Sequence, residues 1–337
     1  MMDRPRFDHL RALTDHNGLF EHAQFDVPRR DHGYCVDDVS RALIVVGREP
    51  EQTADLAELA ETYLRFLEGA VGLDGLAHNR MRADGTWADE RAMGDWWGRL
   101  LWALGTTAAH APDASSRDRA LRAFHRAAQQ RTPDRRTIAF AALGAAEVVA
   151  VMPADRAARG ILLDLVAAVP PTQDPIWPWP EGRLEYANAV IPEALIAAGE
   201  ALGDTAVTER GLHLLAFLLA LETTGDRLSV TGSAGRGPGE QGPLFDQQSI
   251  EVAALADACA RAFATTGDTG WIAAITMSWA WFTGLNDSEA SMFDDETGAG
   301  FDGLMIGGRN ENRGAESTLA ALSTYQQARR AGRLVPA

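Results

Sequence analysis

Two adjacent acidic residues, Asp37 and Asp38, end a polar and aromatic stretch that begins at Asp31, and they lead directly into an apolar segment. Acidic side chains in the first turn of a helix are stabilised by the helix dipole and cap free backbone N–H groups. That structural role is one interpretation of the pair. The other is catalysis, since two neighbouring carboxyl groups can supply a general base or nucleophile. The catalytic interpretation gains support because the same arrangement, a long polar loop before an apolar helix, recurs along the chain.

The other long polar segments also carry acids, amides and aromatic residues. We predict that Asp37 and Asp38 supply a base or nucleophile and that Glu181 or Asp246 supplies an acid. Sugars present apolar CH faces beside hydroxyl edges, so a site for them needs aromatic rings together with carboxylates, amides and guanidinium groups. The residues predicted to bind such a substrate are His32, Tyr34, Trp96, Arg99, Trp177, Trp179, Tyr186, Asn188, Gln247, Gln248, Glu251, Asn312 and Glu316. Arg99 either pairs with Asp95 or Asp38 or holds a substrate carboxylate or phosphate.

Composition excludes several other kinds of site. The formal net charge of −16 disfavours nucleic acid and anionic membranes as partners, because both require a basic surface. The 31 basic residues are all arginines, which excludes Schiff-base chemistry and a phosphate-loop lysine. The eight histidines are scattered and the two cysteines, Cys35 and Cys259, form no zinc motif. We therefore expect no metal and no cofactor.

The elements that must position these residues are helices, since apolar residues recur at helical spacing almost throughout and strand patterns are nearly absent. About twelve helices are expected, the first at about 4–13, the third at 51–68, the sixth at 132–152 and the last at 314–330. Short connections follow the even-numbered helices, whereas most connections after odd-numbered helices are long. Because short connections join antiparallel neighbours, all long loops should lie at one end. The alternation predicts an all-α, single-domain (α/α)6 toroid over residues 1–337, with the even-numbered helices as its inner ring.

Four segments of the chain resemble one family of domains. They are HGYC-x-DD at residues 32–38, GRLLWALG at 98–105, FDQQ-x-IE at 245–251 and N-x-GAESTL at 312–319. The first is similar to the "HGYCTDDNARAL" signature of a six-hairpin toroid domain that is often fused behind bacterial glycosyltransferases and belongs to the six-hairpin glycosidase superfamily. The chain differs at Val39 and Ser40, where Asn-Ala is usual, and shows no fused transferase domain. The resemblance implies the (α/α)6 fold and a carbohydrate-active function without nucleotide-sugar transfer.

The first functional hypothesis is therefore a glycoside hydrolase that acts on an oligosaccharide or glycoconjugate. The alternatives are a sugar epimerase or isomerase, in which His32 would act as acid or base, and a non-catalytic glycan-binding domain associated with glycosyltransferases. For the epimerase, only His32 and His78 lie in long loops. The N-terminal segment has no apolar core of a signal peptide and no apolar run approaches the ~18 residues of a membrane span, so a cytoplasmic location is expected. The pattern defines no oligomeric state.

Overall fold

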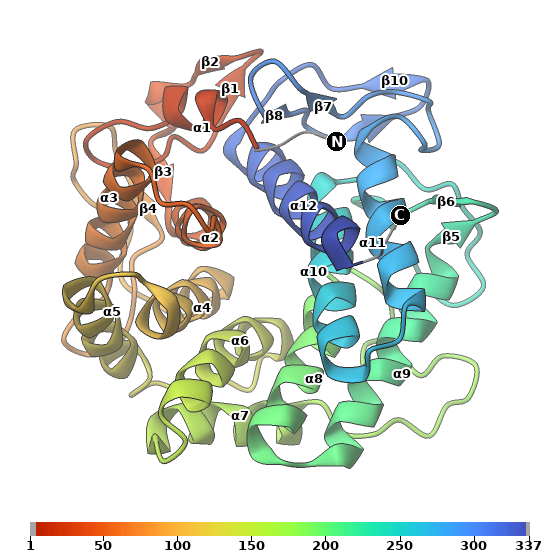
Figure 1. The fold of residues 1–337 in the computed structure, drawn as a ribbon, viewed down its shortest axis with the longest axis horizontal. Helices are drawn as coiled ribbons and strands as arrows, with labels where there is room; N and C mark the ends of the chain where they lie inside the picture. Colours follow the sequence, from red (N-terminus) through yellow and green to blue (C-terminus); the bar gives the residue numbers. More distant parts are fainter. Residues whose placement is uncertain (1–4, 335–337) are drawn as a thin grey trace.

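A computed structural model describes residues 5–334 as two concentric rings of helices (Figure 1). The inner ring consists of α2 (Val36–Gly47), α4 (Asp95–His110), α6 (Arg135–Val151), α8 (Val190–Leu202), α10 (Ser249–Thr266) and α12 (Ala315–Leu334). The outer ring consists of α1 (Asp8–Ala12), α3 (Ala54–Ala70), α5 (Ala114–Ala127), α7 (Arg156–Ala168), α9 (Thr205–Leu221) and α11 (Gly270–Phe282). Each inner helix contacts the next one, and α12 contacts α2, so the ring closes. The predicted (α/α)6 toroid is confirmed.

The burial patterns explain which helices form each ring. On α5 the buried residues are Ala120, Ala123, Phe124 and Ala127, whose spacing of three or four defines one stripe. By contrast, α6 is buried on every face along residues 136–146. Small residues permit this packing, because a Cβ on Gly144 would lie 2.1 Å from the carbonyl oxygen of Leu101. Sequence periodicity therefore separates the helices that face solvent from those enclosed by neighbours.

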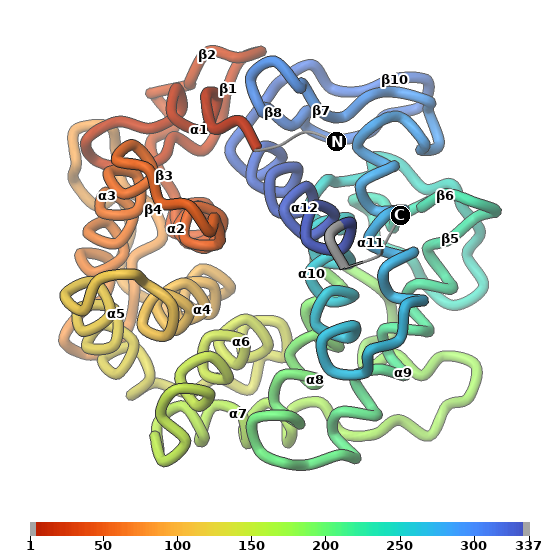
Figure 2. Tube along the Cα trace, in the orientation of Figure 1, coloured from red at the N-terminus to blue at the C-terminus, as the bar shows by residue number. Residues whose placement is uncertain are grey.

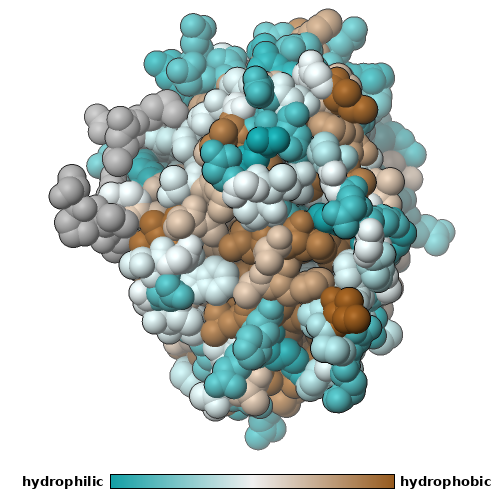
Figure 3. Space-filling view, turned by 90° about the vertical axis from the view of Figure 1, so that its right-hand side faces the viewer, coloured by the Kyte–Doolittle hydropathy of each residue, from teal (hydrophilic) through white to brown (hydrophobic). Residues whose placement is uncertain are grey.

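The outer helices cover the inner ring, and the chain passes from one ring to the other as it circles the molecule (Figure 2). On the side formed by α9 and α11, apolar patches are interrupted by hydrophilic side chains (Figure 3). In the part of the chain that the structure describes, no helix combines the length and apolar character needed to span a membrane.

Helix starts deviate from the expected positions by a few residues because capping side chains set them. α3 begins at Ala54, where the Thr53 hydroxyl accepts the Leu56 N–H, and not at residue 51. α6 begins at Arg135 because Asp134 accepts the Thr137 N–H at 2.8 Å. The predicted first helix shortens to α1, and its expected start at Arg4 lies outside the described residues.

Short strands occur only within the long loops of the described region, as five antiparallel pairs. They are β1 (Ala23–Gln24) with β2 (Val27–Pro28), β3 (Tyr34–Cys35) with β4 (Arg80–Met81), β5 (Thr223–Thr224) with β6 (Arg227–Leu228), β7 (Phe293–Asp294) with β8 (Ala299–Gly300), and β9 (Leu304–Met305) with β10 (Gly308–Arg309). The β3–β4 pair, in which Tyr34 lies opposite Met81, joins two loops that are distant in sequence. The other four pairs are hairpins, each within a single long loop.

Candidate functional site

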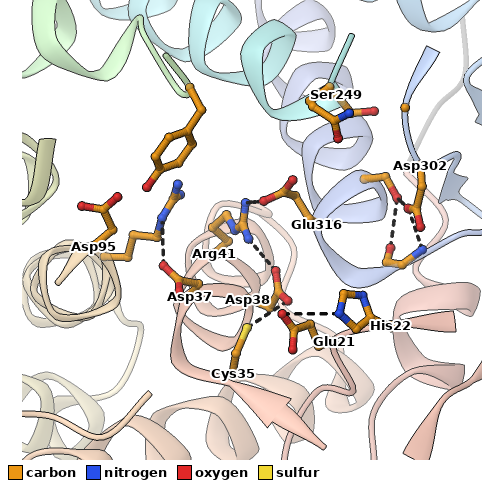
Figure 4. A pocket seen from close by; sticks show the side chains of 16 residues that line it. Glu21, His22, Cys35, Asp37, Asp38, Arg41, Asp95, Ser249, Asp302 and Glu316 are labelled. Carbon is orange, nitrogen blue, oxygen red and sulfur yellow. Dashed lines mark hydrogen bonds and ion pairs between the residues drawn. The ribbon is translucent and has the colours of Figure 1, made fainter. Parts of the chain in front are cut away.

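A polar cavity of about 370 Å³ lies where the inner helices begin, as the alternation of loop lengths predicts. Its side chains come from the first turns of α2, α4, α10 and α12 and from the loops beside them (Figure 4). The lining residues are Glu21, His22, Cys35, Asp37, Asp38, Arg41, Asp95, Arg99, Tyr186, Gln248, Ser249, Asp302, Gly303, Gly314, Glu316 and Ser317. The closed ring thus brings residues from both ends of the chain to one cavity.

The centre of the cavity wall is a buried guanidinium group held between two carboxylates. Arg41 donates from Nη2 to Asp38 Oδ1 at 2.6 Å and from Nη1 to Glu316 Oε2 at 2.7 Å. Asp38 and Arg41 are three residues apart on α2, so they share a helix face. Glu316 comes from the first turn of α12 and closes the arrangement across the ring. Charge-assisted hydrogen bonds of this kind fix both carboxylates in position.

A second arginine holds the neighbouring carboxylate. Arg99 Nε lies 3.1 Å from Asp37 Oδ1, and its guanidinium carbon lies 3.9 Å from the centre of the Phe140 ring. Among the described residues, the two terminal nitrogens of Arg99 have no hydrogen-bond partner. Arg99 therefore positions Asp37 and keeps two donors available to a ligand in the cavity.

The carboxyl groups of the site have pKa values that are shifted in opposite directions. Burial raises the pKa of Asp38 to about 6, even though Arg41 favours its ionised form. Burial also raises the pKa of Asp37, against the charge of Arg99. For Glu316 burial acts in the same sense, but the charge of Arg41 and its hydrogen bond outweigh it, so the pKa of Glu316 is lowered. Near neutral pH, Glu316 is ionised, whereas Asp37 and Asp38 are more easily protonated than free carboxyl groups.

Exposure distinguishes the two aspartates. The Asp38 side chain is 2% exposed and accepts hydrogen bonds on both oxygens, from Arg41 and from the Cys35 thiol at 3.1 Å. The side chains of Asp37 and Glu316 are 23% and 44% exposed. A ligand can therefore reach Asp37 and Glu316 directly, whereas Asp38 is buried and contacts Glu316 only through Arg41.

Beside Asp38 lie Glu21, His22 and Cys35. His22 Nε2 is 3.6 Å from Glu21 Oε1, and its ring lies 5.0 Å from the ring of His32. Oxygen and sulfur atoms of Glu21, Cys35 and Asp38 lie within 4.8 Å of one another, which is close enough to share a metal ion. Protein partners already engage these groups, however: Arg80 pairs with Glu21, and burial raises the pKa of the Cys35 thiol well above its usual value. We interpret the cluster as a hydrogen-bonded network.

The predicted acids Glu181 and Asp246 do not line this cavity. Glu181 accepts a hydrogen bond from Arg136 at 2.8 Å and receives the indole N–H of Trp179 at 3.3 Å. Asp246 is exposed, and its backbone carbonyl accepts the N–H of Ser233. Asp246 lies just before α10, whereas Glu181 lies further from the start of α8, and neither residue is part of the cavity lining.

Four of the residues predicted to bind substrate line the cavity, namely Arg99, Tyr186, Gln248 and Glu316. The predicted aromatic residues other than Tyr186 have structural contacts instead. The Tyr34 hydroxyl donates to Asp15, and the indole N–H groups of Trp96 and Trp177 donate to backbone carbonyls. Trp179 is buried and donates to Glu181. An indole stacking surface therefore does not form at this cavity.

The remaining predicted residues support the loops. Glu251 accepts the backbone N–H groups of Ala187 and Asn188 and the Asn188 side chain, which fixes the segment that carries Tyr186. Gln247 bridges Asp287 and Trp281. Asn312 accepts the Phe25 N–H, and His32 packs on His22 outside the cavity lining. Their polar character reflects buried hydrogen bonding, which a sequence pattern does not distinguish from ligand binding.

Sequence reasoning missed other lining residues. Arg41 had a detectable signal, because it follows Asp38 by three residues on a predicted helix and matches its charge. Glu21 and His22 precede β1 in a loop with no motif, and Asp302 follows β8. Asp302 accepts the Gly314 N–H and the Ser317 hydroxyl, which places it at the start of α12. Only the tertiary structure identifies these loop residues.

No protein-family model matches the chain, and no curated protein matches its sequence. Solved structures do match. A sugar epimerase from a ruminal bacterium is 13% identical over 98% of this chain and 96% of its own, with a TM-score of 0.75. The cellobiose 2-epimerase of Bacillus thermoamylovorans B4167 is 12% identical over 98% and 96%, with a TM-score of 0.73. A GH76 α-mannanase of Bacteroides thetaiotaomicron is 11% identical over 96% and 93%, with a TM-score of 0.67. At these identities the likeness establishes the fold, the (α/α)6 toroid that sugar epimerases and glycoside hydrolases share.

Proposed function

We propose that this chain is a carbohydrate-active enzyme that epimerises or isomerises a short reducing saccharide by proton transfer. The observation that carries the proposal is one cavity in which an accessible ionised carboxylate, Glu316, lies with a carboxyl group of raised pKa, Asp37, and an arginine with free donors, Arg99. Groups whose environments move their pKa values apart form a natural base and acid. The ranking of functions from the sequence, which put hydrolysis first, is thereby reversed.

The chemistry requires three groups. A base removes the proton from the carbon beside the sugar carbonyl, and the electron pair moves onto the carbonyl oxygen to form an enediolate. An acid then returns a proton, to the opposite face of the same carbon for epimerisation or to the former carbonyl carbon for isomerisation. We assign the base to Glu316, the acid to Asp37, and the stabilisation of the enediolate oxygen to the free nitrogens of Arg99.

The arrangement of side chains suits delivery of protons from two directions. His22 and Asp37 both line the cavity and lie on opposite sides of Asp38 (Figure 4). An imidazole ring has two nitrogen atoms that can donate or accept a proton, so His22 offers a second donor or acceptor on its side. The sequence hypothesis of a histidine acid or base thus applies better to His22 than to His32.

The size of the cavity supports a short substrate. Its volume of about 370 Å³ lies at the small end of the range for ligand sites. Trp96, Trp177 and Trp179, which could have extended a binding surface for a long glycan, do not line it. We therefore infer a substrate of one or two sugar units. Full-length matches to two sugar epimerases with TM-scores of 0.75 and 0.73 agree with this class of reaction.

Glycoside hydrolysis is the second candidate, and the charge of the lining favours it. Six carboxyl groups line the cavity, against two arginines and one histidine. An excess of negative charge stabilises an oxocarbenium-like transition state, and a protonated and an ionised carboxyl group are the two components of glycosidic cleavage. In this reaction Asp37 would protonate the leaving oxygen and Glu316 would act as base or nucleophile.

One experiment separates the candidates. The protein is incubated with cellobiose, mannobiose and mannose in D₂O, and products are followed by ¹H NMR. Epimerisation or isomerisation gives a new sugar of the same length with deuterium at the carbon beside the carbonyl. Hydrolysis of a disaccharide gives two monosaccharides without deuterium on carbon.

Two matched variants test the residues. Asp37→Asn should lower turnover at least 100-fold, within the usual range for a general acid or base, whereas Asp246→Asn should leave it unchanged. Loss of activity in Asp246→Asn with full activity in Asp37→Asn would contradict the assignment. Binding of sugars without any conversion would instead favour the non-catalytic glycan-binding hypothesis.

A further inference from the structure

A second cavity opens at the opposite end of the toroid, where the inner helices end. Its volume is about 710 Å³, and none of its lining residues lines the first cavity. A small space of about 40 Å³ lies between the two and shares Arg99 with the first and Arg48 and Trp102 with the second. That space is much smaller than either cavity, so it forms a constriction between them. The two cavities are therefore separate binding spaces on one axis.

One wall of the second cavity presents polar groups that lack partners. Trp102, Thr106 and His110 are spaced by four residues on α4 and so share one face. The Trp102 ring stacks on Phe140 with centroids 6.2 Å apart, and its indole N–H has no partner among the described residues. The Thr106 hydroxyl oxygen is buried without a hydrogen-bond partner. Buried polar atoms are nearly always satisfied, so the Thr106 hydroxyl still has a hydrogen bond to make.

The rest of the lining includes an organised set of charged and amide groups. Asp257 on α10 accepts hydrogen bonds from Arg48 at 2.8 Å and from Gln327 at 2.5 Å. Arg261 lies 3.1 Å from Glu147 and 3.3 Å from Glu193. These contacts come from five inner helices and hold the side chains in place before any ligand arrives.

The charges of this lining nearly cancel. The three arginines that face the cavity are Arg48, Arg261 and Arg330, and the four acids are Glu49, Glu147, Glu193 and Asp257. The hydrogen bond that His110 donates to Glu147 raises the pKa of His110, which brings the charge of the lining closer to neutrality. A lining with little net charge does not attract a highly charged ligand of either sign. A neutral ligand that offers many hydroxyl groups would find both donors and acceptors.

We propose that this second cavity binds a short neutral saccharide, with Trp102 supplying the aromatic surface and Thr106 a hydrogen bond. An indole beside fixed carboxylates, guanidinium groups and an amide matches the apolar faces and hydroxyl edges of a sugar. The proposal goes beyond the proposed function and does not require catalysis at the other end. Arg48 lies two turns from Arg41 at the end of α2, so a ligand here contacts the helix that carries the proposed catalytic acid.

The test uses protein labelled with 5-fluorotryptophan and ¹⁹F NMR. The Trp102 resonance is assigned from a Trp102→Phe variant, and cellobiose, mannobiose and maltose are titrated separately. At least one should shift the resonance in a saturable manner, and the shift should persist in Asp37→Asn, which separates binding here from the first cavity. Thr106→Val should weaken binding about fivefold, the usual effect of one neutral hydrogen bond.

A blocking variant and a control complete the test. Ala264 is exposed and lines the cavity, so Ala264→Phe should narrow the entrance and abolish the shift, whereas Ala83→Phe, in an exposed loop outside both linings, should not. Glucose 6-phosphate should bind at least tenfold more weakly than the neutral sugar. Absence of any shift with all three disaccharides, an unchanged shift in Ala264→Phe, or tighter binding of glucose 6-phosphate would each overturn the proposal.

Discussion

The strongest prediction concerns Asp38, whose buried carboxyl group should make the protein less stable as pH rises. Its pKa is raised from 3.8 to about 6, with burial as the main cause. Between these values the folded protein binds a proton that the unfolded chain has released, so the free energy of unfolding falls with increasing pH. The shift of about two units corresponds to about 3 kcal/mol once pH exceeds both values. At pH values below the pKa of Asp38 in the unfolded chain, Asp38 is protonated in both states and this loss of stability is absent.

Replacing Asp38 with asparagine removes the ionisable group and keeps a side chain of the same size and shape. In the wild type, ionisation of Asp38 lowers the free energy of unfolding by about 1 kcal/mol at pH 4.5 and by nearly the full ~3 kcal/mol at pH 7.5. The difference in unfolding free energy between Asp38→Asn and the wild type should therefore move by about 2 kcal/mol in favour of the variant between these pH values. Any change in hydrogen bonding caused by the amide adds a constant that does not depend on pH.

Urea denaturation followed by circular dichroism at pH 4.5 and 7.5 measures this difference. Titrating groups that do not interact with Asp38 affect both proteins equally and cancel in the comparison. Asp246→Asn serves as the matched control, because Asp246 is exposed, and its difference from the wild type should stay constant. A difference for Asp38→Asn that is constant, or that moves against the variant at higher pH, would mean that Arg41 outweighs burial and that Asp38 is fully ionised near neutral pH.

Three further predictions concern catalysis and packing. Glu316→Gln should lower turnover at least 100-fold in a steady-state assay, while Glu311→Gln, an exposed acid nearby in sequence, should not. Gly144→Ala should destabilise the fold by about 1–3 kcal/mol in urea denaturation, because the added Cβ meets the carbonyl of Leu101; equal stability would show that α4 and α6 can separate without cost. Asp134→Ala should cost about 1 kcal/mol of unfolding free energy, since it removes the cap of α6, whereas Asp134→Asn should recover most of it.

Much of the fold was predictable because its determinants are local. Helical periodicity, capping residues such as Asp113 and Asp134, and the alternation of short and long connections each act over a few residues. Errors in the helices were confined to their ends, as at α3, where a threonine cap and not the preceding acidic residues sets the start. The short strand pairs were missed because each has two residues per strand, too few for an alternating pattern.

The candidate site was predictable only in part. Asp37, Asp38, Arg99 and Glu316 were identified from their types and their positions at helix starts, and they line one cavity. Glu181 had the same kind of signal but is held by Arg136, whose own position depends on how α6 packs. The raised pKa of Asp38 could not be predicted from the sequence either, because it arises from burial by side chains that are far away in the chain.

The sequence by itself determined the helices, their order and the end of the toroid at which the acids gather, because hydrogen bonding along a helix and the length of a connection are properties of neighbouring residues. Only the tertiary structure decided which acids face the cavity, since a side chain's direction follows from the rotation of its helix against partners distant in sequence. It also decided the charge state of those acids, because closing the ring removes Asp38 from water and sets Arg41 between it and Glu316.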